Sequence, residues 1–465
     1  MFRAENSNDA NALHATGKSL RKQTPRSSHG DWTPAADRPD PLNLLQVQDK
    51  SRLQPLLPIK YGRMMASPFA FLRGSAVVMA ADLASTPVTG LNTTLCGDAH
   101  LANFGLFASP ERRVVFDVND FDETYPGPWE WDLKRLAASA VVAGRDNGFG
   151  DKTCRELALV VSRAYREAMQ RLAEMPIMDV WYYHVDASSV IKLFDKYDQK
   201  GAKKARKTLR KARSHTSAHA LAKISHLVDG QRQFINSPPL LVRLAELMTD
   251  EEKQMAREQG SLEQGWEEYK RSVPEERRRL LARYRITDAA LRVGGVGSVG
   301  TRCSIVLLEG ERPEDALILQ QKEAGASSLQ AYLPKHDFAS QAERVIVGQR
   351  LMQASSDIFL GHMHGQTTGV QYYWRQFKDM KGSFDVTVFD AKGVGTYLAV
   401  CGACLARAHA RAGEPAAIAG YLGKATAFDK AISRFAVAYA DQTEKDHKAL
   451  LDAIESGRIV ATPGV

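Results

Sequence analysis

Apolar residues recur at helical spacing in several stretches of the chain. Residues 67–85, 132–145 and 154–175 place apolar side chains at positions i, i+3, i+4 and i+7, which predicts amphipathic helices. The segment from about 190 to 290 continues helical and highly charged, without a linker rich in glycine or proline. The stretch from Tyr397 to about Ser456 is helical again. Helices are therefore expected in both the first and the last part of the sequence.

The pattern changes at residue 291. Apolar and β-branched residues in 291–310 and 316–324 predict strands around a glycine-rich turn and a hairpin. A helix is predicted over 338–353, and a further β-rich stretch follows it. Earlier in the chain, 93–107 passes from a short strand into a loop, and 114–123 begins as a brief buried strand. The order α-rich, β-rich, α-rich predicts an α+β fold.

This pattern divides the chain into four segments. Residues 1–45 are polar and lack periodicity, which predicts a flexible leader. Residues 46–290 and 396–465 are expected to form one large helical lobe, and residues 291–395 a small antiparallel β lobe.

Composition and charge narrow the class of protein. Of 465 residues, 44% are hydrophobic and 25% charged, which is typical of a soluble globular chain. No run approaches the ~18 apolar residues that a membrane helix needs, and the first residues lack the apolar core of a secretory signal. Five cysteines without a bridge-like spacing favour a reducing cytoplasm. Cys401 and Cys404 form a CxxC within an Ala-rich helical pattern, which favours a structural role over a zinc or redox site.

Basic residues gather in two places. With 62 Lys and Arg against 54 Asp and Glu, the formal charge is +8. Residues 196–215 are strongly basic on a predicted helix, but no aromatic residues are interleaved with them, so a solvated helix face is favoured over binding of nucleic acid. Arg375, Lys378 and Lys381 follow the last predicted strands and are candidates for holding anions.

The segment CGDAHLANFG places Asp98 and Asn103 five residues apart, directly after a strand. A carboxylate near a substrate hydroxyl can accept its proton, and an amide oxygen five residues later can reach a metal ion beside it. This is the spacing of kinase catalytic loops. Taken alone, the pair is better explained as an Asx turn that caps local backbone. His100, in the same loop, is an accessory candidate.

The segment FDVNDFDE places Asp117 at the end of a buried strand, nineteen residues after Asp98. Asn103 and Asp117 together would suit Mg²⁺, which prefers hard oxygen ligands. Asp120 and Asp122 crowd the same turn and are accessory candidates. Neighbouring carboxylates repel each other unless cations neutralise them. The alternative is a solvated acidic turn, and the flanking apolar residues argue against it.

The segment VGGVGSVG contains Gly295, Gly297 and Gly300 in a GxGxxG pattern. The apolar, β-branched run that follows is a strand pattern, so the helix that a dinucleotide-binding turn requires is missing. A glycine turn between two strands would let backbone N–H groups approach phosphates, as in kinases; a plain β-turn is the alternative. Lys322, at the end of the next predicted strand, and Glu343, on the helix after it, would form the kinase Lys–Glu pair.

The order of these groups is unusual. In ordinary kinases the glycine loop comes first, whereas here Asp98 precedes Gly295 by about two hundred residues. A circular permutation would explain this order, because permutation is tolerated when the original termini lie close together.

Several segments resemble bacterial domain-of-unknown-function family 2252, which is grouped with protein-kinase-like and aminoglycoside-phosphotransferase-like proteins. The segments are SPFAFLRG, CGDAHLANFG, FDVNDFDE, GPWEWDLKRLAAS, VGSVGTR and RQFKDMKGS. The resemblance spans roughly residues 45–455 and implies a circularly permuted protein-kinase-like fold, but the family has no settled substrate. By similarity to small-molecule phosphotransferases it implies Asp98 as base, Asn103 and Asp117 as metal ligands, and Asp132 as a structural residue. Cys96 stands where those enzymes often have histidine.

The leading functional expectation is a kinase-like phosphotransferase that uses ATP and Mg²⁺ on a hydroxyl-bearing small molecule. Asp98 would orient the acceptor, Asn103 and Asp117 would hold Mg²⁺, and Lys322 would contact phosphates. One alternative is a metal-dependent phosphoesterase, suggested by GDAH and by GHMHG at 361–365. Another is a catalytically inactive nucleotide-binding protein on the same fold.

Overall fold

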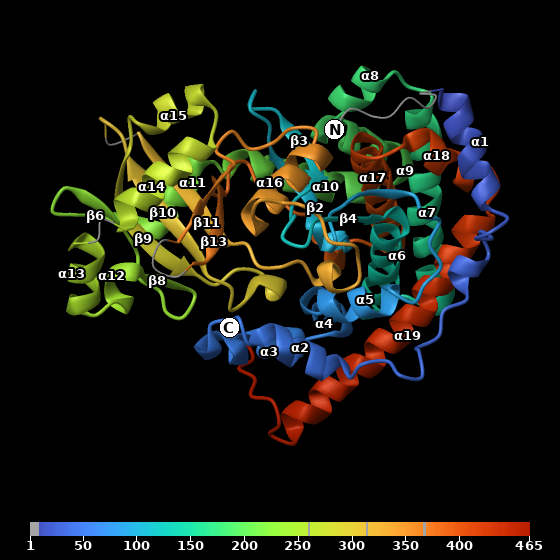
Figure 1. The fold of residues 1–465 in the computed structure, drawn as a ribbon, viewed down its shortest axis with the longest axis horizontal. Coiled ribbons are helices and arrows are strands. Elements are labelled where there is room, and N and C mark those ends of the chain that lie inside the picture. The colour runs from blue at the N-terminus through green and yellow to red at the C-terminus, as the bar shows by residue number, and fades with distance from the viewer. Residues whose placement is uncertain (1–8, 259–260, 313–314, 366–368) are drawn as a thin grey trace.

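The structure is a computed structural model that describes residues 9–258, 261–312, 315–365 and 369–465. It has an α+β architecture. An antiparallel sheet and the short helices around it form one half, and long helices form the other (Figure 1). No helix within these described ranges is both long and apolar enough to cross a bilayer.

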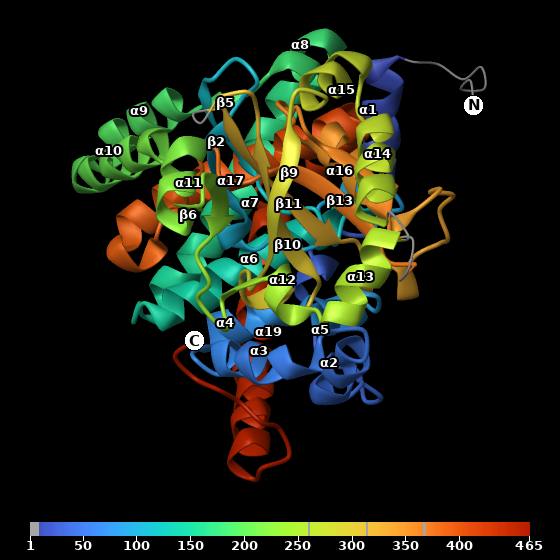
Figure 2. The same cartoon turned by 90° about the vertical axis from the view of Figure 1, so that its left-hand side faces the viewer.

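The main sheet has six antiparallel strands in the order β12-β13-β11-β10-β9-β8. Figure 2 shows β9, β10 and β11 side by side. The strands are β8 (Leu241–Arg243), β9 (Arg285–Arg292), β10 (Cys303–Glu309), β11 (Ala316–Glu323), β12 (Gly361–His364) and β13 (Gln371–Gln376). The strands and hairpin predicted over 291–324 are present, and Lys322 lies on β11 opposite Cys303 and Tyr373.

The two faces of this sheet follow the period-two alternation of its strands. Val306 and Leu308 of β10 pack with Trp266 and Tyr269 of α14 (Ser261–Ser272). Ile305 and the other alternate residues of β10 and β11 pack on the opposite face, with α11 (Ser217–Ile224). Further along that second face, apolar residues give way to Gln320, Lys322 and Arg375, which line a cavity.

Helix was predicted throughout 190–290, and the structure differs in part. The segment contains α9 (Ala187–Tyr197), α10 (Gln199–Ser214), α11, α12 (Leu244–Leu247), α13 (Asp250–Glu258), α14 and α15 (Glu275–Leu281). It also contains the hairpin of β6 (Ser225–Val228) and β7 (Gln231–Phe234), and then β8. Asp229 and Gly230 turn the hairpin with φ of 50° and 79°, and an Asp-Gly pair is a strong hairpin signal. The boundary expected at residue 290 falls inside β9.

The helical half is built around four long helices: α6 (Trp129–Asp146), α7 (Asp151–Ala173), α17 (Ala391–Ala412) and α19 (Ala427–Glu455). Small residues bring them close together. A Cβ at Gly402 of α17 would lie 2.5 Å from the carbonyl oxygen of Val161 on α7. Cys401 and Cys404 are free thiols buried on the same helix.

Short strands in the helical half carry two loops toward the sheet. β1 (Asn92–Leu95) pairs with β4 (Tyr125–Pro128), and β2 (Phe104–Ala108) pairs with β3 (Val114–Val118). β5 (Val185–Asp186) completes the second group. Loop 96–103 joins β1 to β2, and loop 119–124 joins β3 to β4. Residues of both loops line the cavity that faces the main sheet.

The flexible leader expected over residues 1–45 is not what the structure shows from Asp9 onward; residues 1–8 lie outside the described ranges. Helix α1 (Ala10–Leu20) packs on α18 (Pro415–Leu422) so closely that a Cβ at Gly17 would lie 1.9 Å from the carbonyl oxygen of Ala417. Trp32 is buried, and Arg38 bridges Asp82 and Asp446. A few anchoring side chains hold a segment whose overall composition is polar.

Four helices follow: α2 (Pro41–Asp49), α3 (Leu57–Met64), α4 (Pro68–Gly74) and α5 (Ala76–Leu83).

The basic segment predicted at 196–215 contains the whole of α10, which runs beside α9 at the edge of the molecule (Figure 2). Its small residues Ala202, Ala205 and Ala212 are buried, whereas its lysines and arginines are exposed. The helix is therefore amphipathic, with its apolar stripe already covered by the protein.

Lowering the pH from 7 to 5 is expected to destabilise the protein through His29 of the docked N-terminal segment. His29 is buried with its Nε2 2.7 Å from the hydroxyl oxygen of Tyr421. Burial, with a smaller effect of Lys134, lowers the pKa of His29 to about 3. The unfolded chain has a histidine pKa near ~6.5, so below that pH the unfolded state takes up a proton that the folded state does not. The free energy of unfolding should fall by about 2 kcal/mol at pH 5.

Chemical unfolding of wild type and His29→Phe at pH 7 and 5 tests this expectation. Phenylalanine fits the edge-on contact with Phe428 but does not titrate. The variant should lose about 2 kcal/mol less than wild type between the two pH values, whatever its absolute stability. An equal loss in both proteins would contradict the role of His29.

Candidate functional site

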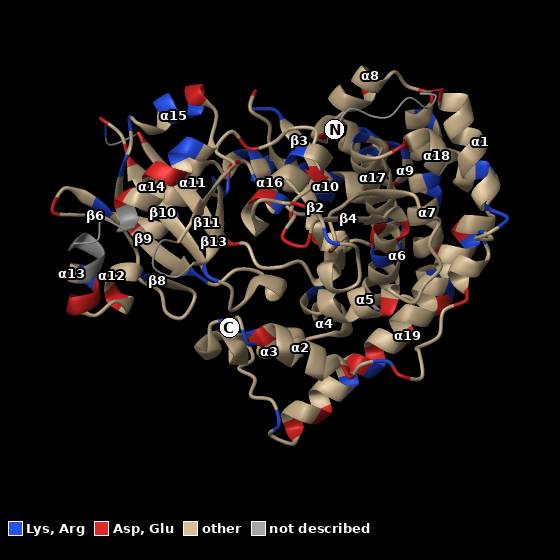
Figure 3. Cartoon of the chain, in the orientation of Figure 1, with Lys and Arg blue, Asp and Glu red and all other residues tan. Residues whose placement is uncertain are grey.

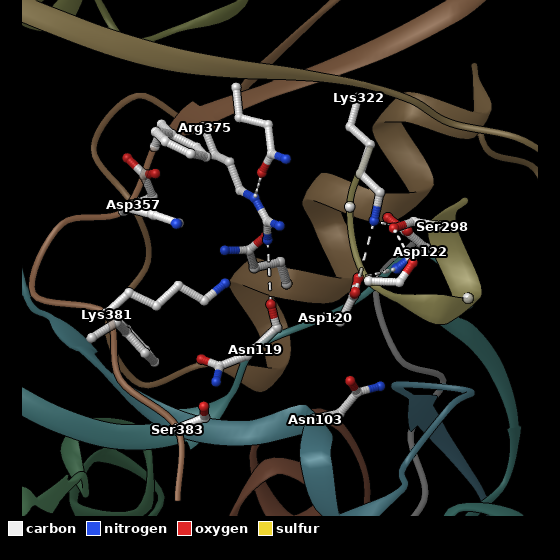
Figure 4. A pocket seen from close by; sticks show the side chains of 18 of the residues that line it. Asn103, Asn119, Asp120, Asp122, Ser298, Lys322, Asp357, Arg375, Lys381 and Ser383 are labelled. Carbon is white, nitrogen blue, oxygen red and sulfur yellow. Dashed lines mark hydrogen bonds and ion pairs between the residues drawn. The ribbon is translucent and has the colours of Figure 1, made fainter. Parts of the chain in front are cut away.

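One cavity of about 620 Å³ lies between the main sheet and the loops of the helical half (Figure 4). It is lined by α2 and α4, by the loops 96–103 and 119–123, by the glycine turn 294–298, by β11 and β13, and by the segment after β13. We call residues 377–383 the hinge segment, because they connect the main sheet back to the helical half. Most of the lining side chains are polar or charged.

Asp98 enters the cavity from the loop after β1. Its carboxylate forms an ion pair with Arg135 of α6, whose guanidinium also donates to the carbonyl of Leu72 at 2.9 Å. His100 Nε2 lies 3.6 Å from the other carboxylate oxygen. Burial lowers the pKa of His100 to about 4, although Asp98 opposes the shift, so the imidazole is neutral at pH 7. Asn103 Nδ2 donates to the Asp98 carbonyl at 2.7 Å.

The backbone of this loop is held from below. Asp132 of α6 accepts the N–H groups of Cys96 and Gly97, at 2.8 and 3.0 Å. Gly97 has a φ of 79°, and a Cβ there would lie 2.0 Å from the carbonyl oxygen of Glu123. The position therefore requires glycine. The two acidic loops consequently touch each other at this point.

The structure does not place Asp117 in the cavity. It lies within β3, and its side chain is 4% exposed. Its carboxylate pairs with the buried Arg407 of α17, contacts Cys404 Sγ at 3.2 Å and accepts the N–H of Ala354 at 3.2 Å. The sequence pattern predicted a metal ligand at Asp117. Successive side chains of a strand point to opposite faces, and the face of β3 that carries Asp117 is turned to the core.

Asp120 and Asp122, the accessory candidates, reach the cavity in its place. Lys322 pairs directly with Asp122, and its Nζ lies 3.7 Å from Asp120 Oδ2. The Tyr373 hydroxyl donates to Asp122 Oδ1 at 2.6 Å. Burial opposes ionisation of Asp120, but Lys322 and then Arg375 outweigh it and hold its pKa at about 2. Burial likewise disfavours the charge on Lys322, but the two carboxylates raise its pKa well above the usual value.

Glu343 is not the partner of Lys322. It lies on α16 (Gln341–Met352), where its backbone N–H donates to Ser340 Oγ at 2.9 Å and its carboxylate accepts the N–H of Ala339 at 2.6 Å. These bonds cap the helix start, with Ser340 as the N-cap and Glu343 accepting the N–H of the residue before it. Its neighbour Arg344 points inward and donates to the carbonyls of Asp122 and Gly325, at 2.9 and 2.8 Å, and to that of Thr124. Helix α16 thus fixes the loop 119–124 through Arg344, which the sequence pattern did not single out.

The glycine turn covers one end of the cavity. Gly295 and Gly297 line it, whereas Gly300 is buried, has a φ of 86° and accepts the N–H of Leu53 at 2.7 Å through its carbonyl. Beneath the turn, Arg73 of α4 also lines the cavity. A Cβ at Gly297 would lie 3.0 Å from the carbonyl oxygen of Arg73. Burial lowers the pKa of Arg73, which nearby Asp98 opposes.

The described lining of the cavity offers two side-chain oxygen donors of the kind that Mg²⁺ binds, and not the larger set of ligands that a closed metal site needs. Within the described residues no group of three or more His, Cys, Asp and Glu side chains is placed to hold a metal ion. Asn103 and Asp120 nevertheless present an amide and a carboxylate to the same part of the cavity (Figure 4). The amide is oriented by its bond to the Asp98 carbonyl. Mg²⁺ commonly takes one or two protein oxygens and completes its shell with water and substrate phosphates.

The GHMHG segment is not part of this cavity. His362 and His364 lie on β12 and are absent from its lining. His364 Nδ1 is 2.8 Å from a carboxylate oxygen of Glu268 on α14. The GDAH and GHMHG segments are therefore not brought together into one site.

Comparison with known proteins gives a family but no close relative. No curated protein and no solved structure matches the chain. Residues 52–453 match the family described as uncharacterized protein conserved in bacteria (DUF2252). This match includes the cavity from Arg73 of α4 to the hinge segment, and the chain belongs to that bacterial family.

Proposed function

We propose that this protein is a phosphotransferase that uses ATP and Mg²⁺ to phosphorylate a hydroxyl group of a small molecule. One observation carries the proposal. Asp98, Asn103 and Asp120 line the same cavity as Gly295, Gly297 and Lys322, although about two hundred residues separate the two groups. Phosphoryl transfer depends mainly on such positioning and on charge neutralisation.

The order of the elements supports a kinase-like fold with a circular permutation. The glycine turn joins β9 to β10, Lys322 follows on β11, and α16, β12 and β13 come next. Protein kinases likewise have a glycine-rich loop, a strand lysine and then a helix. The Asp98–Asn103 loop, the β2–β3 hairpin and Asp120 would be the catalytic part, here placed before the sheet instead of after it.

Each residue would have a distinct role. Asp98, held by Arg135, would accept a hydrogen bond from the acceptor hydroxyl and direct it at the phosphate. Asn103 and Asp120 would hold Mg²⁺, which when bound neutralises and orients the phosphates. Lys322 would contact the phosphates from β11, and the glycine turn would cover them with backbone N–H groups. Asp122 would take the part that glutamate has in ordinary kinases and hold the lysine.

Turnover of ATP with Mg²⁺ across a panel of hydroxyl-bearing metabolites tests this proposal. With the correct acceptor, Asp98→Asn should slow turnover by about 10²–10⁴-fold, because it removes the group that accepts the hydroxyl proton. Asp37→Asn, which makes the same change at an exposed position outside the cavity, should leave turnover unaltered. Equal turnover in Asp98→Asn and wild type would contradict the assignment. ATP binding without turnover for any acceptor would instead indicate the inactive alternative.

A further inference from the structure

The hinge half of the cavity concentrates positive charge. Arg292 at the end of β9, Arg375 of β13, and Lys378 and Lys381 of the hinge segment all line it. Apart from the basic helix α10, basic and acidic residues elsewhere are interspersed over both halves of the molecule (Figure 3). Figure 4 shows Arg375 and Lys381 extending into the same part of the cavity. We call these four side chains the hinge cations.

No acid neutralises the hinge cations by direct pairing in the described part of the chain. Asp357 uses its carboxylate to accept the backbone N–H groups of Phe359, at 2.8 Å, and of Gln376. Asp379 pairs with Arg112. Asp120 lies nearer to Lys322 and belongs to the proposed metal site. The three acids that line this half are thus already engaged.

Neutral contacts hold three of the hinge cations in place. Arg375 Nε donates to Gln320 Oε1 at 3.0 Å, and its Nη1 donates to the carbonyl of Asn119 at 3.3 Å. Arg292 Cζ lies 5.2 Å, and Lys378 Nζ 5.4 Å, from the centre of the Phe377 ring. These contacts orient the cations without cancelling their charge.

Desolvation and mutual repulsion disfavour the charge on three of the hinge cations. Arg375 differs, because desolvation is outweighed by Tyr373 and the carboxylates of Asp120 and Asp122, which raise its pKa. Desolvation by the surrounding cavity walls, followed by Arg375, lowers the pKa of Lys381 to about 7, although Asp120 opposes the shift. Burial and Arg292 lower the pKa of Lys378, and burial and Arg375 lower that of Arg292. An anionic ligand bound among these groups would relieve their mutual repulsion.

The backbone that carries two of the hinge cations is strained. Lys378 and Met380 both have a φ of 46°, in the left-handed region that residues with a Cβ rarely adopt. The strain is maintained by bonds on either side, from Met380 N–H to the His215 carbonyl at 2.9 Å and from Gly382 N–H to the Leu106 carbonyl at 2.9 Å. Strained backbone held in place by its surroundings is common at ligand sites.

We propose that the hinge cations form a second phosphate-binding subsite, separate from the phosphates held near Lys322. Four cations around one space suit a multiply charged group, and the planar guanidinium of arginine matches phosphate oxygens well. A ligand that spans the cavity would then carry phosphate toward both ends. The source would be a phosphorylated acceptor or a further phosphate of the donor. The subsite stands on its own contacts, and only its part in phosphoryl transfer rests on the proposed function.

Binding of inorganic pyrophosphate, measured by calorimetry at low ionic strength without Mg²⁺ or nucleotide, tests the subsite. Without a metal ion, the carboxylates of Asp98, Asp120 and Asp122 repel an anion from the Lys322 end, so the anion should prefer the hinge cations. Lys381→Met and Arg292→Met should each weaken binding about tenfold or more, because each removes a charged hydrogen-bond donor. Lys152→Met removes the same charge from the exposed start of α7 and should change the dissociation constant by less than about twofold.

Thermal melts keep this test independent of folding. Removing one of several cations that repel each other should leave the melting temperature of Lys381→Met equal to or above that of wild type when no anion is present. Absence of pyrophosphate binding in wild type, or equal binding in wild type and both variants, would overturn the subsite.

A second titration, with the protein saturated by Mg²⁺ and a non-hydrolysable ATP analogue, distinguishes the two sources. Unchanged pyrophosphate binding would show that the subsite is open to a phosphorylated acceptor. Binding lost in competition would show that the donor's own phosphates occupy it. If no acceptor supports ATP turnover while the variants still weaken pyrophosphate binding, the proposed function fails and the subsite stands. If ATP is turned over but Lys381→Met leaves pyrophosphate binding unchanged, the proposed function stands and the subsite fails.

Discussion

Asp117→Asn is expected to lower the free energy of unfolding by about 3–5 kcal/mol, because it breaks a fully buried ion pair. The side chains of Asp117 and Arg407 are 4% and 1% exposed. Without the carboxylate, the guanidinium of Arg407 would remain in the core without a countercharge. Its Nε and Nη1 have no hydrogen-bond partner among the described residues, so none of these is placed to compensate.

Urea unfolding of Asp117→Asn and Asp120→Asn compares a buried and a cavity-facing acid on neighbouring positions of the same segment. Asp120, whose side chain is 36% exposed, should tolerate the change with a loss below about 1 kcal/mol. The activity should behave in the opposite way, since only Asp120 is proposed to hold Mg²⁺. If Asp117→Asn keeps the stability of wild type but loses its dependence on Mg²⁺, then Asp117 is the metal ligand and the proposed site must be redrawn.

The contrast between these two aspartates shows what a sequence pattern can resolve. The acidic segment and the strand before it were predicted correctly, because apolar residues lead directly into clustered carboxylates. The choice among those carboxylates depends on where the strand ends and which face points to the core. A shift of three residues decides it here. Strand β3 continues to Val118, so Asp117 stays in the sheet and Asp120 is the first acid in the loop.

The small sheet was the most predictable part of the fold. Its strands have the period-two alternation and the glycine turn that local sequence signals detect. The N-terminal segment was not predictable in this way, because α1 is held by distant contacts such as Gly17 against Ala417. Those contacts depend on tertiary structure and leave no periodic pattern in a polar segment.

The arginines that build the site were also beyond local patterns. Arg135 holds Asp98 from α6, and Arg344 holds the acidic loop from α16. Both are buried cations inside amphipathic helices, where composition alone would place them at the surface. The sequence signal nearest to Arg344 was Glu343, which lies on the helix after the strand lysine. The structure shows that its neighbour Arg344 is the residue that faces inward. A helix turns by about 100° per residue, so a one-residue difference moves a side chain to another face.

Lys322→Ala is expected to slow turnover by about a hundredfold or more, because it removes the cation proposed to stabilise charge on the transferred phosphate. Lys322 is 3% exposed and reaches the cavity from β11, where Asp120 and Asp122 hold it. Asp122→Asn should give a smaller loss of the same kind, since it only orients the lysine. The double variant should lose less than the two single losses combined, because the residues interact. Steady-state turnover and ATP affinity of the three variants measure this coupling.

Glu343→Ala is the matched control for that coupling, since Glu343 lies on the helix next to the site but caps it instead of touching Lys322. Its loss should cost about 0.5–2 kcal/mol of stability and leave the turnover of the folded protein close to wild type. A turnover defect in Glu343→Ala as large as that of Lys322→Ala, and non-additive with it, would show that the helix moves to pair with the lysine during the reaction. The resting contact between Lys322 and Asp122 would then belong to an inactive arrangement of the cavity.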